Sequence, residues 1–178
     1  MSDPVLFVAG SPSETSRSTF VARRVADALE ADGIAARLVS LRDFDAADVL
    51  FARTTEPRVV RLVDAARVAP AIVLVTPVYK ATYGGGLKAL VDLIPPDALG
   101  GKPGLAIATT KLDAHGLLVA RAFDALFTFF GVERVAETLV LLDSEIRIEG
   151  AAPSFATSAE ARIAGAAGAL ARAIVAQR

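Results

Sequence analysis

The chain has 178 residues, of which 53% are hydrophobic and 22% are charged, and its formal net charge is −1. This composition is typical of a globular domain and lacks the positive charge with which proteins bind nucleic acids or anionic membranes. The absence of cysteine excludes disulfides, thiolate metal sites and cysteine nucleophiles. Without a signal-peptide pattern or an apolar run of membrane-spanning length, we expect one domain over residues 1–178, located in the cytoplasm.

Short apolar runs rich in β-branched residues alternate with segments of helical periodicity. We predict strands over residues 5–9, 37–41, 71–76, 104–108 and 135–142. We predict helices over residues 16–31, 57–68, 86–93, 114–130 and 157–177, with Gly33 ending the first and a capping box, Thr157 to Glu160, beginning the last. Strands separated by helices form a parallel sheet, so we expect an α/β fold with a three-layer, doubly wound, five-stranded parallel sheet. Such sheets bind ligands beyond the carboxyl ends of their strands, here the first, third and fourth.

Hydroxyl groups and one arginine follow the first predicted strand, where the next helix begins. Ser11, Ser16, Arg17 and Ser18 lie within eight residues of one another. Backbone amides at a helix N-terminus attract anions, and these side chains add further donors. The segment therefore predicts a phosphate-binding loop, although Ser16 or Ser18 could also serve only as a helix cap.

The third predicted strand leads into a loop that contains both tyrosines of the chain, Tyr79 and Tyr83, followed by three glycines at 84–86. This loop would form a wall for a planar ligand: Pro77 would hold the backbone extended, Tyr79 and Tyr83 would supply aromatic rings, and the glycines would let backbone amides approach a ring closely. The alternative is a flexible loop whose aromatic side chains pack on a neighbouring helix or subunit.

The fourth predicted strand ends in Thr109, Thr110 and Lys111. Their hydroxyls, backbone donors and single cation would face the other edge of the same ligand. Lys111 could equally be a solvated surface charge.

Several chemistries are disfavoured by what the sequence lacks. His115 is the single histidine, no Gly-x-Ser-x-Gly elbow is present, and no spacing of histidine and carboxylates indicates a metal site. We interpret His115 as a helix-start or packing residue. Neither a P-loop nor a Gly-x-Gly-x-x-Gly turn follows any strand, so one terminal phosphate suits the first loop better than a dinucleotide does.

These segments together resemble the NADPH-dependent FMN reductase family, and most closely the flavin reductases of alkanesulfonate assimilation. The resemblance rests on the loops at 10–18 and 76–83 and the run at 86–92, with support from 50–53, and it extends to about Asp143. It implies a flavodoxin-like fold, a homodimer or homotetramer, and two-electron transfer from NADPH or NADH to FMN. Mapped onto this chain, it assigns the FMN phosphate to Ser11, Ser16, Arg17 and Ser18 and the flavin ring to Pro77, Val78, Tyr79 and Lys80.

Because a flavin carries out hydride chemistry itself, we assign no catalytic residue. The resemblance implies that reduced flavin passes to a partner monooxygenase. Two alternatives share the same binding motifs: an FMN-retaining reductase of quinones, azo dyes or metal oxyanions, and a flavodoxin-like electron carrier without reductase activity, which the net charge of −1 disfavours.

The chain departs from these relatives at two places. The relatives have glycines after the fourth-strand threonine, where this chain has Thr110 and Lys111, so the expected flavin contacts of Thr109 and Thr110 rest on position alone. Arg121 stands where the alkanesulfonate-type enzymes insert a tyrosine that the family associates with a helical bulge and with flavin release. We therefore expect an unbulged helix and firmer flavin retention, or else a merely solvated arginine.

The helix at 86–93 carries apolar residues beside the tyrosine loop. We expect Leu87, Leu90, Val91 and Ile94 either to form a self-associating surface or to pack in the core.

Overall fold

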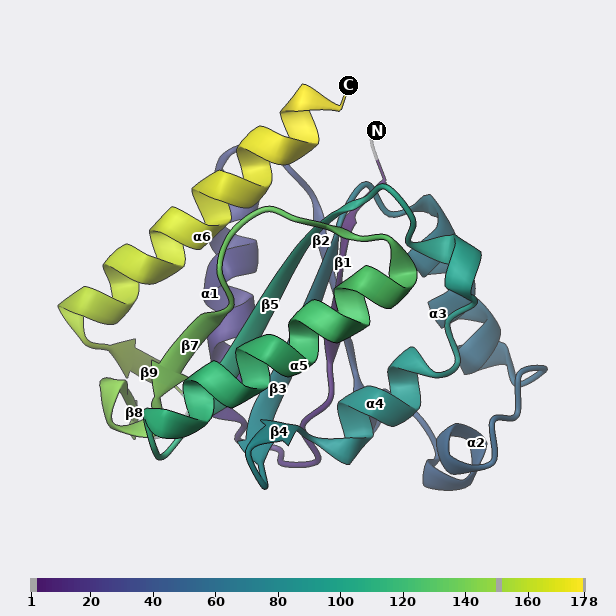
Figure 1. Cartoon of the computed structure of the whole chain (residues 1–178), viewed down its shortest axis with the longest axis horizontal. Coiled ribbons are helices and arrows are strands. Elements are labelled where there is room, and N and C mark those ends of the chain that lie inside the picture. Colours follow the sequence, from purple (N-terminus) through teal and green to yellow (C-terminus); the bar gives the residue numbers. More distant parts are fainter. Residues whose placement is uncertain (1–2, 150–151, 178) are drawn as a thin grey trace.

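The computed structural model describes residues 3–149 and 152–177. Its sheet runs in the order β2-β1-β3-β5, and β6 and β7 both pair with β5 beyond β3. The principal strands are parallel and comprise β1 (Val5–Ala9), β2 (Ala36–Ser40), β3 (Ile72–Tyr79), β5 (Pro103–Thr110) and β7 (Leu139–Leu142). The α/β fold with a doubly wound sheet is therefore confirmed, and Figure 1 shows the strands running side by side behind α5 (Ala114–Phe130).

The sheet has seven strands rather than the five we expected. The additional strands are β4 (Thr82–Tyr83), antiparallel to β3, and β6 (Glu133–Arg134). A strand of two residues is too short to produce a periodic pattern, which explains why the sequence did not reveal either. A separate antiparallel hairpin, β8 (Ile146–Glu149) with β9 (Ala152–Phe155), was also not predicted.

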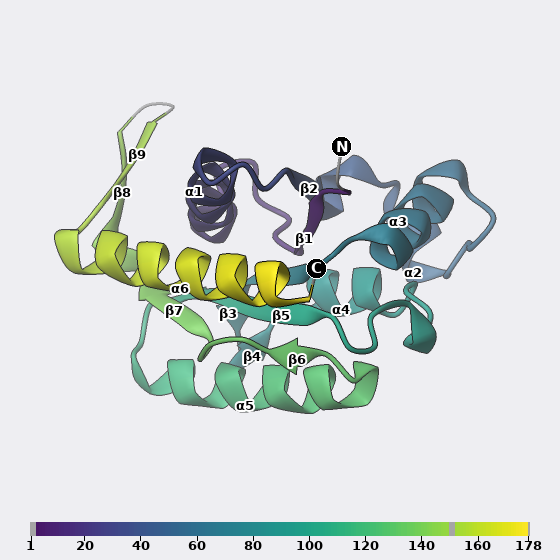
Figure 2. The same cartoon turned by 90° about the horizontal axis from the view of Figure 1, so that it is seen from above.

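Helices cover both faces of the sheet, and Figure 2 shows α1 and α5 on opposite sides of it. Val5 and Phe7 of β1 pack with α1 (Arg17–Ala31) and α6 (Thr157–Ala176). The intervening Leu6 and Val8 pack with the helices on the other face, namely α3 (Pro57–Val68), α4 (Gly85–Val91) and α5 (Ala114–Phe130). Alternate side chains of a strand point to opposite faces, so a strand buried on both faces is a continuous apolar run.

Most helix boundaries agree with the expected ones. Ser16 caps α1 by accepting a hydrogen bond from the Thr19 amide, and Gly33, at φ +76°, follows its end. The capping box predicted for α6 is wrong: the N-cap residue is Ala156, which makes no side-chain cap. Glu160 instead pairs with Arg24 of α1 at 3.1 Å. The short helix α2 (Ala46–Leu50) was not predicted.

The expected self-associating surface on α4 is wrong, and the core-packing alternative is right. Leu87, Leu90 and Val91 are fully buried, and Ile94 is 3% exposed. All four belong to the core between the sheet and α3, α4 and α5. Within residues 3–149 and 152–177, no helix combines the length and apolarity needed to cross a membrane.

Candidate functional site

A cavity of about 850 Å³ opens at the carboxyl ends of β1, β3 and β5, as expected for this sheet. We call it the strand-end cavity. Its lining residues come from the loops after these strands, from the first turn of α5 and from the turn after β7, and they are Ser11, Ser13, Thr15, Ser16, Arg17, Pro77, Val78, Tyr79, Lys80, Thr109, Thr110, Lys111, Leu112, His115 and Asp143. The structure thus brings together nine of the ten predicted site residues, all except Ser18.

One end of the cavity, which we call the serine end, consists of residues 11–17. The Ser16 hydroxyl accepts a hydrogen bond from the Thr19 amide at 3.3 Å, and the Ser11 hydroxyl accepts one from the Ser13 amide at 3.2 Å. Because Ser16 caps only Thr19, the earlier first-turn amides of Arg17 and Ser18 have no intrahelical acceptor. Hydroxyl and amide donors therefore converge at the beginning of α1, an arrangement suited to an anion.

Ser18 lies behind the serine end rather than on the cavity wall. It is 1% exposed, and its hydroxyl oxygen is 3.0 Å from that of Ser16. Ser18 can therefore orient the Ser16 hydroxyl, whereas the sequence predicted a direct contact with the phosphate.

Asp143 lines the cavity next to Arg17, which no sequence motif had indicated. Its Oδ2 atom lies 3.9 Å from Nη1 of Arg17, and Nε of Arg17 donates a weak hydrogen bond to the Ile146 carbonyl at 3.4 Å. The aspartate follows β7, more than a hundred residues after Arg17, so no local motif could have indicated it. These contacts hold the guanidinium at the rim of the serine end.

Glu145 supports the turn that carries Asp143. It accepts hydrogen bonds from the Leu142 amide at 2.8 Å and from Arg162 at 2.5 Å. Burial favours the neutral form of this carboxyl, but the Leu142 amide and Arg162 outweigh burial, so the pKa of Glu145 lies below its usual value.

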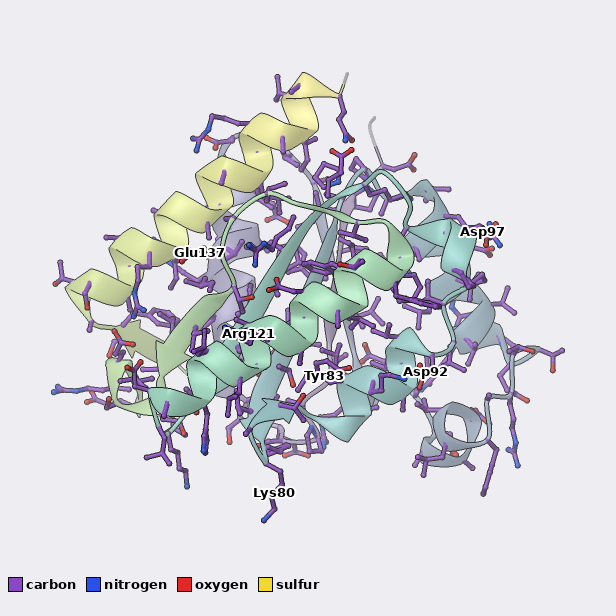
Figure 3. The ribbon with its side chains drawn as sticks, in the orientation of Figure 1. Lys80, Tyr83, Asp92, Asp97, Arg121 and Glu137 are labelled. Atoms are coloured by element: carbon purple, nitrogen blue, oxygen red, sulfur yellow. The ribbon has the colours of Figure 1, made fainter. Side chains whose placement is uncertain are left out.

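The opposite end of the cavity, which we call the hairpin end, consists of residues 77–80 and 109–112. The register Val78 to Tyr83 and Tyr79 to Thr82 leaves Lys80 and Ala81 as a two-residue turn. Both adopt left-handed backbone angles, with φ of 52° and 66°, as in the type I′ turns that usually contain asparagine or glycine. Lys80 projects from the tip of this hairpin, away from the body of the protein (Figure 3).

Only one of the two tyrosines forms the wall that the sequence predicted. Tyr79 lines the cavity and is 48% exposed. The Tyr83 ring instead lies 5.6 Å from that of Phe123 and packs against the core. The hairpin is fixed to the sheet because the Gly84 amide donates a hydrogen bond to the Thr76 hydroxyl at 2.8 Å.

We expected the glycines after the hairpin to bring backbone amides close to a planar ligand. None of residues 84–86 lines the cavity. A Cβ atom on Gly86 would lie 2.8 Å from the Gly10 carbonyl oxygen and would clash with Leu41, and one on Gly10 would clash with the backbone of Leu87. These two glycines allow α4 to pack closely against the end of β1.

The loop after β5 completes the hairpin end. Thr109 and Thr110 are each 3% exposed, and the Thr110 hydroxyl bonds to the amide and carbonyl of Leu112 at 3.2 and 3.1 Å. Lys111 is exposed at the mouth of the cavity. His115, which we interpreted as a helix-start or packing residue, lies in the first turn of α5 and lines the cavity.

A second cavity, of about 910 Å³, lies between α5, the segment before β7, and α6. Arg121 lines it and is exposed (Figure 3). Asp124 and Arg134 on its wall pair with each other at 2.5 Å, and no loop from the carboxyl end of β1 or β3 reaches it. The helix that carries Arg121 is α-helical from Ala114 to Phe130, in agreement with the expected unbulged helix.

Comparisons with known proteins agree on one family. Residues 4–145 match the family model for NADPH-dependent FMN reductase. A protein named FMN reductase (NADPH) from Pseudomonas putida strain KT2440 is 34% identical over 151 residues, which cover 84% of this chain and 77% of that protein. Another of the same name, from Escherichia coli strain K12, is 30% identical over 159 residues, which cover 89% of this chain and 83% of that protein.

The fold has similar neighbours among solved structures. The apo form of a protein described as NADH:FMN oxidoreductase (EmoB) superposes with a TM-score of 0.86 at 24% sequence identity, covering 96% of this chain and 89% of the other. At this identity the likeness concerns the fold alone.

Proposed function

The chain belongs to the NADPH-dependent FMN reductase family and is an NAD(P)H-dependent FMN oxidoreductase; we propose that FMN binds in the strand-end cavity, with its phosphate at the serine end and its ring at the hairpin end. One observation supports this orientation above all. Anion-binding donors gather at one end of the cavity, whereas Pro77, Val78 and Tyr79 offer an apolar, aromatic wall at the other.

The cavity fits the cofactor in size and in chemistry. Its volume of about 850 Å³ lies within the range of pockets that enclose small molecules. FMN supplies the two-electron acceptor, and the protein supplies binding, orientation and electrostatics. Ser11, Ser16 and Arg17 would hold the phosphate, and Ser18 would fix the Ser16 hydroxyl. Tyr79, Thr109 and Thr110 would flank the ring, and the nicotinamide would approach the face that the cavity mouth leaves open.

We further propose that reduced FMN leaves the enzyme for a partner flavin-dependent monooxygenase. The exposed rim of the cavity supports this, since Tyr79 there is 48% exposed. We also propose that the enzyme is located in the cytoplasm. We treat residues 1–178 as one domain, because a single principal sheet organises the described residues.

An oligomer is also part of the proposal, on a surface different from α4. Leu112, which lines the strand-end cavity, is 56% exposed, and Leu117 and Leu118 near the start of α5 are 63% and 49% exposed. An apolar group of this kind next to a ligand site commonly has a partner, and a second copy of the chain would cover it in a homodimer or homotetramer. Sedimentation at micromolar concentration that gave only monomer would contradict this.

The second candidate is a reductase that retains FMN and passes electrons to another acceptor, such as a quinone. It is favoured by Arg121 and the unbulged α5, since the family associates the inserted tyrosine and its bulge with flavin release.

Steady-state kinetics with the purified protein test both candidates. With NADPH and FMN varied, a released flavin gives intersecting lines, whereas a retained flavin gives ping-pong reduction of a quinone by a yellow protein. If the serine end holds the phosphate, kcat/KM for FMN exceeds that for riboflavin by roughly tenfold or more, the effect of one or two charge-assisted hydrogen bonds. Equal values for FMN and riboflavin would contradict the proposed orientation.

A further inference from the structure

Lysine is scarce in this chain and concentrated at the strand-end cavity. The sequence has four lysines against fifteen arginines, and two of the four, Lys80 and Lys111, line the hairpin end. Neither forms an ion pair with any carboxylate in the described part of the chain. The one described carboxylate on the cavity wall, Asp143, is beside Arg17 at the serine end. The hairpin end therefore carries two uncompensated positive charges.

The hairpin holds Lys80 in a conformation that lysine does not favour. Its φ of 52° and that of Ala81, 66°, lie in the left-handed region, which costs a residue with a Cβ atom free energy relative to glycine. The pairs of β3 with β4 and the hydrogen bond from Gly84 to Thr76 impose this turn. The fold thus fixes the backbone position from which the Lys80 side chain extends, at the rim of the cavity mouth.

Lys111 stands on the other loop of the mouth. It follows the buried Thr109 and Thr110, and the bonds of Thr110 to Leu112 define the turn that carries it. Both lysines are exposed to solvent at the edge of the cavity. Their position suits an anion that remains outside the cavity while another part of the same molecule enters it.

We propose that Lys80 and Lys111 form a binding subsite for the 2′-phosphate of NADPH and so give the enzyme its preference for NADPH over NADH. This inference rests on the proposed function, because it requires FMN to occupy the cavity with its phosphate at the serine end. It gives Lys80, which the resemblance assigned to the flavin ring, a contact with the dinucleotide instead, since the Lys80 side chain projects from the hairpin tip away from the body of the protein (Figure 3). A nicotinamide that enters over the flavin ring leaves the phosphate-bearing half of the dinucleotide at the mouth, beside the two lysines.

The chemistry of the two dinucleotides supports this assignment. They differ only in a phosphate monoester, which carries a charge of about −1.5 to −2 at neutral pH. Lysine binds phosphate well as a point charge. Proteins with this fold differ in the dinucleotide that their names give: the two relatives are named for NADPH and the solved neighbour for NADH.

The test compares kcat/KM for NADPH and NADH at saturating FMN and low ionic strength. The variants are Lys80→Asn, which removes the charge but suits a left-handed turn, Lys111→Ala, and the double variant. Lys88→Ala is the matched control, because Lys88 lies on α4, pairs with Asp92 and does not line the cavity.

We expect each single variant to lower kcat/KM for NADPH by roughly fivefold to tenfold, through KM, and to change the NADH value less than about twofold. In the double variant, the kcat/KM values for NADPH and NADH should be nearly equal. In the unmodified enzyme, about 0.5 M salt should narrow the preference for NADPH, because exposed charges are screened. The control should leave all values unchanged.

If the variants lost kcat/KM equally with NADPH and NADH, the proposal would be overturned, and the lysines would instead be assigned to binding of the flavin or of the pyrophosphate. The proposal would also be overturned if the double variant had the same kinetic constants as the unmodified enzyme, or if it bound FMN more weakly. A failure of the proposed function would be seen separately, because the unmodified protein would then show equal kcat/KM values for FMN and riboflavin.

Discussion

The serine end and the hairpin end of the strand-end cavity are built in different ways. The serine end is one continuous strand, turn and helix, and its polar atoms are fixed by local hydrogen bonds such as that from the Thr19 amide to Ser16. The hairpin end combines two loops that lie about thirty residues apart, and its tip adopts left-handed angles without glycine. The comparison shows that a site can be rigid at one end through local hydrogen bonds and at the other through packing imposed from a distance.

The two ends meet at one close contact. Gly10 directly follows β1 and leads into the serine end, and Gly86 lies just after the hairpin, in α4. With a Cβ atom on Gly86, the distance to the Gly10 carbonyl oxygen would be 2.8 Å, which is shorter than real Cβ contacts. This contact therefore sets the spacing between the loop that carries the serines and the segment that carries Tyr79 and Lys80.

The largest expected effect comes from breaking that contact. Gly86→Ala should lower the free energy of unfolding by about 1–3 kcal/mol, the usual cost of adding a methyl group to a tightly packed site. Gly85→Ala is the matched control on the same helix, because a Cβ atom there meets nothing within 4 Å, and it should leave stability unchanged or raise it by up to about 1 kcal/mol. Urea unfolding of both variants measures the difference, and equal values for the two would contradict the role assigned to this contact.

A second variant tests whether the serine end, rather than the hairpin end, binds the FMN phosphate. Arg17→Ala should weaken FMN binding by roughly tenfold, the effect of losing one charge-assisted hydrogen bond to the phosphate, and should leave riboflavin binding nearly unchanged. Arg23→Ala is the control, since Arg23 is an exposed arginine of α1 that does not line the cavity. Flavin fluorescence titrations measure both ligands, and similar losses for FMN and riboflavin would place the phosphate elsewhere.

Local patterns explain why much of this fold was predictable. The bounds expected for β1, α3 and α5 agree with those observed, because each is a continuous apolar run or a long periodic segment. The serine end was predictable for a similar reason: its residues are neighbours in the sequence, and their effect on an anion is a property of one helix N-terminus.

The remaining features depend on contacts between distant segments. Asp143 reaches the cavity only because β7 lies next to β5. The glycines at 84–86 suggest conformational freedom when considered alone, yet Gly86 is required by the Gly10 backbone. Tyr83 resembles a ligand wall in the sequence, whereas the structure packs it on Phe123. In each case the deciding partner lies outside the segment from which the inference was made.

The smallest expected effect concerns the strained tip of the hairpin end. Ala81 has a φ of 66°, so Ala81→Gly removes a steric penalty and should raise the free energy of unfolding by about 0.5–1 kcal/mol, once the greater freedom of glycine in the unfolded chain is subtracted. The same substitution at Ala125, an exposed position within α5, should instead lower it by about 0.5–1 kcal/mol. Opposite signs from one chemical change would show that the hairpin turn is imposed by its surroundings. A loss of stability in both variants would mean that the left-handed turn at Lys80 and Ala81 carries no strain, and the contrast between the two ends of the cavity would then reduce to their hydrogen bonding.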